Sequence, residues 1–188
     1  EQKEFRSILN AVIQEADNIR LGVVTFEDRE MNDEVEEEEL NDEPQNLWQL
    51  VMAYQEARAV LYDEDAGWSE QEEAVQTLEL LWNEGLTVAA HQLGKCYRDG
   101  LAVIPDDEQA EAWFLCSAQA GKDYSQYALG KLLQEQRRII EAVEWYNQAS
   151  AQGNQYADYR LGKFYLTGKE IPKDVAEAIR HLTASAEA

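Results

Sequence analysis

The sequence predicts an all-α fold, a right-handed α/α superhelical solenoid of repeated helix pairs that follows an N-terminal helix and an acidic segment. Three observations support this prediction: a short motif recurs at nearly constant intervals, apolar residues are spaced three and four apart, and turn residues are scarce. Only 3 Pro and 10 Gly occur among 188 residues, which is too few for an all-β chain with many tight turns. A chain of this length with 45% hydrophobic residues can bury a sizeable core.

Residues 1–22 are predicted to form an amphipathic N-terminal helix that stops at Gly22. Its apolar residues recur with the spacing of one helical face; they are Phe5, Ile8, Leu9, Val12, Ile13, Ala16 and Ile19. The chain begins with neither Met nor a signal-peptide pattern. We therefore expect a cytoplasmic fragment of a larger protein.

Residues 23–46 are predicted to be an acidic linker or loop. Within this segment, residues 27–43 hold eleven carboxylates and one Arg. Such a run repels itself and has almost nothing apolar to bury. Two interpretations remain open. The segment is a solvated linker, or it is an arm that docks on a basic surface, either of a partner or of the chain itself.

The negative charge is concentrated in the first half of the chain. The whole sequence has a formal net charge of −22. Residues 1–88 contain 5 basic and 24 acidic residues, whereas residues 89–188 contain 11 and 14. A surface this acidic repels phosphate backbones and anionic membranes, so we expect no direct nucleic-acid binding by the whole chain and no membrane binding. This argument is weaker for the second half alone.

The second half of the chain, residues 89–188, contains an internal repeat. The tripeptide Leu-Gly-Lys occurs at 93–95, 129–131 and 161–163. Nine residues before each of its glycines stands another glycine, and eleven residues before that one stands an alanine. These offsets define three repeats, at about 89–121, 122–153 and 154–188. A unit this small cannot bury its own apolar face, so neighbouring units must stack into a solenoid.

Each repeat is predicted to be a helix pair. The first helix carries Leu-Gly and the second carries Ala-x-x-Trp, as in Ala110 with Trp113. Small residues let the two helices approach closely, which explains why Gly is tolerated inside a helix at a cost of ~1 kcal/mol relative to Ala. Gly121 and Gly153 fit a helix C-terminus that needs a left-handed backbone. The second repeat lacks the Gly and Pro of the other loops, so its turn is expected to be tighter.

Residues 47–88 are predicted to form a degenerate first helix pair. Apolar residues recur with helical spacing up to Leu61. The second part keeps Ala74 and Gly85 at the spacing of the later repeats, but Thr77 takes the place of the Trp.

This set of motifs resembles the Sel-one-like repeat (SLR) family, a relative of the tetratricopeptide repeat. The resemblance rests on Ala-x-x-x-Leu-Gly, a loop with Gly, Pro and Asp, Ala-x-x-Trp followed by Phe or Tyr, and a closing Gly, and it covers residues 89–188 well. His181 stands where the third repeat should have Trp, which predicts a more open or terminal surface there. The resemblance implies a binding scaffold whose partner is a protein or a peptide.

The order of the segments is also similar to the C-terminal region of some bacterial mobilisation proteins, the relaxases of conjugative elements. That resemblance implies an alternative function, an accessory domain of such a protein in conjugative DNA transfer. The His triad and the metal-associated tyrosine nucleophile of relaxase chemistry do not occur in this sequence.

No catalytic, metal or cofactor site is expected, and the chain is not expected to be an enzyme. His91 and His181 are far apart in sequence and lack the Cys or carboxylate spacing of a zinc site. Cys96 and Cys116 are expected to be small, reduced core residues. The sequence contains no Gly-rich phosphate loop, no Gly-x-Ser-x-Gly motif and no paired catalytic acids with a partner base.

One set of residues is predicted to form a partner-binding face. Its members stand three residues before and one residue after each Leu-Gly glycine; they are His91, Tyr127 and Tyr159, and Lys95, Lys131 and Lys163. The two positions are four apart and share a helical face, so stacked first helices would align an aromatic column beside a basic ladder. Two interpretations stay open: the tyrosines pack between repeats while the lysines keep the face soluble, or the face is a groove for an acidic or extended peptide.

Overall fold

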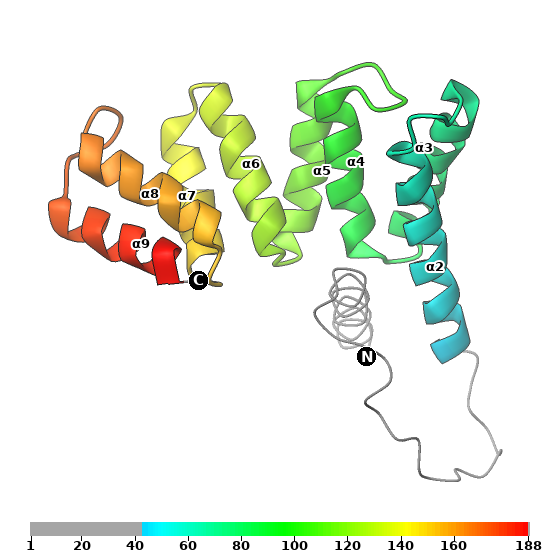
Figure 1. The fold of residues 1–188 in the computed structure, drawn as a ribbon, viewed down its shortest axis with the longest axis horizontal. Coiled ribbons are helices and arrows are strands. Elements are labelled where there is room, and N and C mark those ends of the chain that lie inside the picture. Colours follow the sequence, from blue (N-terminus) through cyan, green and yellow to red (C-terminus); the bar gives the residue numbers. More distant parts are fainter. Residues whose placement is uncertain (1–42, 188) are drawn as a thin grey trace, which may run out of the picture. The chain divides into compact units, whose positions relative to one another are not determined.

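The computed structural model describes residues 43–187, where it contains eight helices and no strand. The helices are α2 (Glu43–Leu61), α3 (Trp68–Asn83), α4 (Thr87–Asp99), α5 (Asp107–Gln119), α6 (Asp123–Glu135), α7 (Ile139–Ser150), α8 (Gln155–Thr167) and α9 (Val175–Glu187) (Figure 1). These helices confirm the predicted all-α repeat fold. The predicted helix over residues 1–22 and residues 23–42 of the predicted acidic segment lie outside the described residues. None of the eight helices is long and apolar enough to cross a bilayer.

The chain divides into two compact units, with the boundary between Ala89 and Ala90. In the first unit α2 and α3 pack against each other. Their buried apolar residues include Val51, Tyr54, Ala57, Leu61, Ala74, Val75, Leu78 and Leu81. Thr77, at the position that Trp takes in two later repeats, is partly buried, and its hydroxyl donates to the Glu73 carbonyl at 2.9 Å. A short polar side chain therefore leaves this pair with a smaller contact surface than a Trp would give.

The second unit consists of helix pairs that share one apolar core. The first helices of the pairs, α4, α6 and α8, alternate along the chain with the second helices, α5, α7 and α9 (Figure 1). From α5 to α9, each helix packs against the next. The core contains Ala110, Phe114, Ala118, Leu129, Leu132, Leu133, Ala142, Tyr146, Ala149, Ala157, Leu161 and Phe164. These residues recur at three- and four-residue intervals, so each helix presents one stripe to the core.

The Leu-Gly glycines are sites of close helix packing. A Cβ atom on Gly94 would lie 2.6 Å from Phe114 Cδ1, and one on Gly130 would lie 2.8 Å from Tyr146 Cε1. Real Cβ contacts are essentially never this short. The predicted reason for glycine inside these helices, the close approach of a bulky residue from the second helix, is therefore confirmed.

Helix ends in the second unit use a recurring C-terminal hydrogen-bond pattern. After α5, the Lys122 N–H donates to the Ser117 carbonyl and Gly121 has φ = 85°, which is the geometry of a Schellman motif. After α6 the same pattern runs from Arg138 to the Leu133 carbonyl, and Arg137 takes the left-handed conformation with φ = 65°. The turn between α6 and α7 is shorter than the loops before α5 and α9, as expected from its lack of Gly and Pro.

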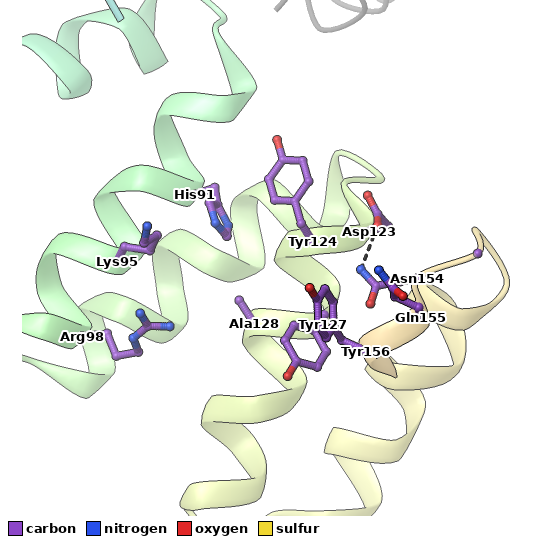
Figure 2. A pocket seen from close by; sticks show the side chains of 11 residues that line it. His91, Lys95, Arg98, Asp123, Tyr124, Tyr127, Ala128, Asn154, Gln155 and Tyr156 are labelled. Atoms are coloured by element: carbon purple, nitrogen blue, oxygen red, sulfur yellow. Dashed lines mark hydrogen bonds between the residues drawn. The ribbon is translucent and has the colours of Figure 1, made fainter. Parts of the chain in front are cut away.

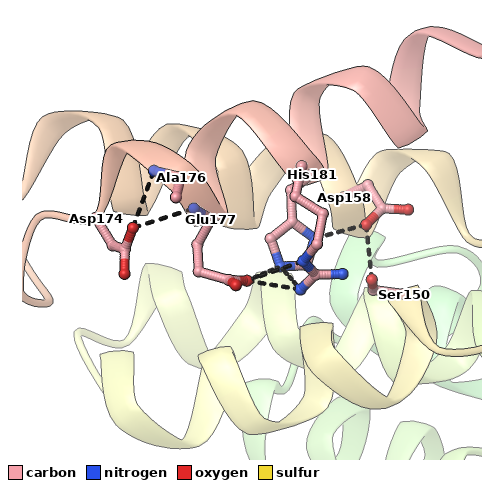
Figure 3. Close-up of polar contacts among 7 residues, drawn as sticks. Ser150, Asp158, Asp174, Ala176, Glu177 and His181 are labelled. Atoms are coloured by element: carbon pink, nitrogen blue, oxygen red, sulfur yellow. Dashed lines mark hydrogen bonds and ion pairs between the residues drawn. The ribbon is translucent and has the colours of Figure 1, made fainter.

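His181 is buried, and the prediction of a more open surface there was wrong. Only 1% of the residue is exposed. Its Nε2 lies 2.8 Å from Arg180 Nη2 and its Nδ1 lies 2.7 Å from Asp158 Oδ1 (Figure 3). The ring also stacks on Tyr165, with 5.9 Å between centroids and 5° between planes. A polar residue is tolerated here because both ring nitrogens have hydrogen-bond partners.

Candidate partner-binding site

A cavity of about 500 Å³ opens among the first helices of the second unit. Side chains of α4, of the first half of α6 and of the N-terminal end of α8 surround it (Figure 2). Its lining consists of His91, Lys95, Arg98, Asp123, Tyr124, Tyr127, Ala128, Gly153, Asn154, Gln155 and Tyr156. Three consecutive repeats therefore contribute to one concave site.

The α4 wall of the cavity carries the basic side chains. His91, Lys95 and Arg98 follow one another at intervals of four and three residues, which places them on one face of α4. His91 Nδ1 is hydrogen-bonded to Ser125 Oγ at 2.9 Å. Its ring is nearly perpendicular to that of Tyr124, with 83° between planes and 4.6 Å between centroids. These two contacts fix the orientation of the His91 ring at the cavity surface.

Arg98 already holds a carboxylate at this end of α4. Its Nε and Nη2 atoms donate to the two Asp99 oxygens, both at 2.7 Å. The guanidinium of Arg98 lowers the pKa of the Asp99 carboxyl, and the charges of Lys95 and Lys131 act in the same direction. Three cations therefore stabilise the charge of one carboxylate, and the bidentate pair with Arg98 is among the stronger kinds of polar contact in proteins.

The opposite wall is aromatic. The Tyr127 ring lies between two others, with its centroid 5.8 Å from that of Tyr146 and 5.7 Å from that of Tyr156. Tyr146 is fully buried, whereas Tyr156 is 61% exposed. The row of rings therefore runs from the core to the surface. It gives the cavity a rigid aromatic side with partly accessible faces.

Polar groups close the end of the cavity beside α8. Asn154 accepts a hydrogen bond from the Ala157 N–H at 3.0 Å and so caps α8. Its Nδ2 atom donates to Asp123 Oδ2 at 2.8 Å. Asn154 thus links the N-terminal ends of α6 and α8, which are the equivalent helices of adjacent repeats.

The cavity brings together half of the residues predicted for the partner-binding face. His91, Lys95 and Tyr127 line it, whereas Lys131, Tyr159 and Lys163 do not. Lys131 Nζ lies 3.8 Å from Glu135 Oε1, one turn further along α6. Lys163 Nζ lies over the Tyr159 ring, 5.4 Å from its centroid. These three residues lie on the first helices but outside the concave site.

Several lining residues were missed by the sequence prediction, and a second repeated pattern could have located two of them. Tyr-x-x-Tyr occurs at 124–127 and at 156–159, six and three residues before the Leu-Gly glycine. Side chains three apart lie on one helical face, so Tyr124 and Tyr156 belong to the same surface as Tyr127 and Tyr159. Arg98, Asp123 and Asn154 have no counterpart at equivalent positions, and no repeated signal marks them.

The two sets of helices in this unit differ in charge. The first helices α4, α6 and α8 hold five basic and four acidic residues. The second helices α5, α7 and α9 hold one basic and seven acidic residues. The lysines and arginines of the helical array are thus gathered on the helices that surround the cavity.

The described residues offer little for metal or thiol chemistry. Among residues 43–187, no group of three or more His, Cys, Asp or Glu side chains is placed to hold a metal ion. Cys96 and Cys116 are both free thiols. Cys96 is fully buried, and its burial raises the pKa of the thiol to about 11, which suppresses the reactive thiolate at neutral pH.

Comparisons with known proteins identify the repeat. A family model described as the Sel1 repeat matches residues 87–122, 123–154 and 155–188, more than half of the chain. No curated protein matches the chain.

Two solved structures show the same fold. A protective antigen present in uropathogenic Escherichia coli strains, which displays an SLR fold, is 24% identical with a TM-score of 0.64; the match covers 78% of this chain and 32% of that one. A Sel1 repeat protein from Oxalobacter formigenes is 25% identical with a TM-score of 0.63, over 73% of this chain and 55% of that one. The chain therefore spans only part of the length of either structure.

Proteins built from this repeat generally serve as scaffolds for protein–protein interaction. The three matched segments include every helix from α4 to α9. The chain belongs to the Sel1 repeat family.

Proposed function

We propose that the chain is a non-catalytic scaffold for protein–protein interaction and that the face formed by α4, α6 and α8 binds a peptide or protein partner. The observation that supports this most strongly is the cavity of about 500 Å³ to which three successive repeats contribute. It combines partly exposed tyrosines with basic and amide groups. Tyr and Arg are enriched in protein interfaces, because they supply large rigid contact areas and directed hydrogen bonds.

The buried polar clusters favour binding over catalysis. Ser125 Oγ lies 2.9 Å from His91 Nδ1, which resembles an activated nucleophile, but Ser125 is fully buried and its hydroxyl also pairs with Ser117 at 2.7 Å. A buried hydroxyl cannot reach a substrate. The second such cluster, Asp158 with His181, is likewise enclosed between helices. We therefore assign both clusters a structural role in helix packing and no catalytic role.

Site-directed photo-crosslinking tests the proposed face. A photoreactive phenylalanine analogue replaces Tyr159, which is 48% exposed on α8, or Ile140, which is 66% exposed on α7. Ile140 is the matched control on a second helix. We expect a covalent adduct with a protein partner from Tyr159 and none from Ile140 when the variants are irradiated in cells that produce the chain. Adducts only from Ile140, or equal adducts from both, would place the interaction elsewhere.

A further inference from the structure

We infer that the cavity takes an extended peptide segment in which acidic and aromatic side chains alternate. The acidic side chains lie against Lys95 and Arg98 of α4, and the aromatic side chains lie among Tyr124, Tyr127 and Tyr156. This inference rests on the proposed function and specifies the chemistry of the partner.

The charge distribution selects an acidic partner. The first helices hold five basic and four acidic residues. The second helices are strongly acidic. An acidic segment is therefore attracted to the first helices and repelled by the second, which fixes the side on which it docks.

The α4 wall has the composition of a carboxylate-binding surface. Asp99 shows how a carboxylate is held there, with Arg98 at 2.7 Å and the charges of Lys95 and Lys131 acting on it. Lys131 is also 3.8 Å from Glu135. A carboxylate from a partner that enters the cavity meets the same Lys95 and Arg98 side chains, which line it.

The aromatic wall supplies the second half of the recognition. Tyr156 is 61% exposed, and its ring continues the row that Tyr127 begins. Tyrosine loses little conformational entropy on binding because it has only two side-chain torsions, and this row is further fixed by the buried Tyr146. Aromatic side chains of a partner can pack against these rings in offset or edge-to-face arrangements.

The two walls face each other, which is why the segment is extended and alternating. Figure 2 shows His91, Lys95 and Arg98 on one side of the cavity and Tyr127 and Tyr156 on the other. Successive side chains of an extended peptide point to opposite sides. A segment in which acidic and aromatic residues alternate therefore presents its carboxylates to α4 and its rings to the tyrosines at the same time.

Peptide titrations test this inference with the full chain. The probe is an acetylated, amidated and fluorescently labelled peptide of alternating Glu and Phe, of about eight residues, which spans about 27 Å when extended. The comparison peptide has Gln in place of every Glu. Fluorescence anisotropy measures both with the unaltered protein, with the double variant Lys95→Glu/Arg98→Glu, and with Lys169→Glu. Lys169 is an exposed lysine in the loop before α9 and lies outside the cavity lining.

We expect the Glu–Phe peptide to bind the unaltered protein at least about fivefold more tightly than the Gln–Phe peptide, as several partly screened charge contacts would give. The double variant weakens its binding by about tenfold or more, whereas Lys169→Glu changes it by less than about twofold. Raising the salt concentration from about 0.05 M to about 0.5 M weakens binding of the Glu–Phe peptide alone. Circular dichroism checks that each variant is folded.

Three results overturn the inference: equal affinity for the two peptides, equal effects of the double variant and of Lys169→Glu, or no saturable binding of the Glu–Phe peptide up to about 1 mM. The comparison of the two peptides uses only the unaltered protein, so it tests the preference for acidic side chains even if the double variant fails to fold. If a partner crosslinks from Tyr159 but the peptides fail, the proposed function stands and the inference about partner chemistry falls.

Discussion

His181 and Asp158 form a buried hydrogen-bonded pair that joins the last two helices of the array. Nδ1 of His181 lies 2.7 Å from Oδ1 of Asp158, and the two side chains are 2% and 7% exposed. Because the Arg180 guanidinium can only donate, Nε2 of His181 accepts from it and Nδ1 carries the proton that Asp158 accepts. The same Asp158 oxygen also accepts from Ser150 Oγ at 2.6 Å (Figure 3). One carboxylate thus connects α7, α8 and α9.

Replacing His181 by Ala should destabilise the chain strongly. The change removes a ring packed on Tyr165 and leaves the Asp158 carboxylate buried with only the Ser150 hydroxyl as a donor among its described contacts. Loss of one partner of a buried charged hydrogen bond costs about 2–4 kcal/mol. Urea denaturation followed by circular dichroism measures the free energy of unfolding. Lys169→Ala, an exposed change in the same unit, serves as the control; equal effects of the two variants would contradict this role of His181.

Replacing Gly94 by Ala should destabilise the chain although Ala is the better helix former. The new Cβ would lie 2.6 to 2.9 Å from three ring atoms of Phe114, which is fully buried. Overpacking of this kind costs about 1–3 kcal/mol, more than the ~1 kcal/mol that Ala contributes to a helix. Thermal or urea unfolding measures the change.

The double variant Gly94→Ala/Phe114→Leu separates this clash from other causes. Leu has no ring at the position of the contact, so Gly94→Ala should cost less in the Phe114→Leu background than in the unaltered protein. A double-mutant cycle gives the coupling free energy. Strict additivity of the two changes would show that the short contact between Gly94 and Phe114 is not the cause.

The repeat fold could be predicted from sequence because its signals are local. The Leu-Gly glycines and the small residues of the second helices stand at fixed offsets in the sequence. Each is required by a local packing contact, such as that between Gly130 and Tyr146. The burial of His181 could not be predicted in this way. Its partner Asp158 stands 23 residues earlier on another helix, and polarity alone indicates a surface position.

The candidate site could be predicted only in part, for a related reason. His91 and Lys95 follow from helical spacing within one repeat. The cavity, however, forms where α4 and α6 meet the end of α8, so its lining depends on how far each helix is displaced along the next. Asn154 lines it because its amide reaches Asp123 of the preceding repeat. A sequence pattern does not contain that displacement.

Replacing Arg137 by Gly should stabilise the chain. Arg137 has φ = 65° at the position after α6 where the Schellman motifs after α5 and α7 have Gly121 and Gly153. A left-handed backbone costs a residue with a side chain about 1–2 kcal/mol, and glycine avoids most of it, so we expect a gain of about 0.5–1 kcal/mol after the extra entropy of the unfolded glycine chain. The melting temperature measures the gain, and Arg137→Ala, which keeps the strain, is the control. No difference between the Gly and Ala variants would contradict this account.

The two cysteines should differ sharply in reactivity. Cys96 is fully buried with a pKa raised to about 11, whereas Cys116 is partly exposed. Only the thiolate reacts with disulfide reagents, so at pH 8 we expect one thiol to react with such a reagent in the native protein and both to react in urea. The single variants Cys96→Ser and Cys116→Ser assign the fast thiol. Fast labelling of the Cys116→Ser variant under native conditions would contradict the packing of α4.

The central claim is tested most directly with the partner that is identified by crosslinking at position 159. The measurement is the affinity of that partner for two matched variants of the chain. Tyr156→Ala removes an aromatic side chain from the cavity wall, and Ile179→Ala removes an apolar side chain from α9, outside the cavity; each residue is 61% exposed. Calorimetric titration of the purified partner should show binding weakened by about tenfold or more for Tyr156→Ala, the typical cost of an interface hot spot, and by less than about twofold for Ile179→Ala. Equal affinities for the two variants, or a larger loss for Ile179→Ala, would contradict the assignment of the cavity as the binding site.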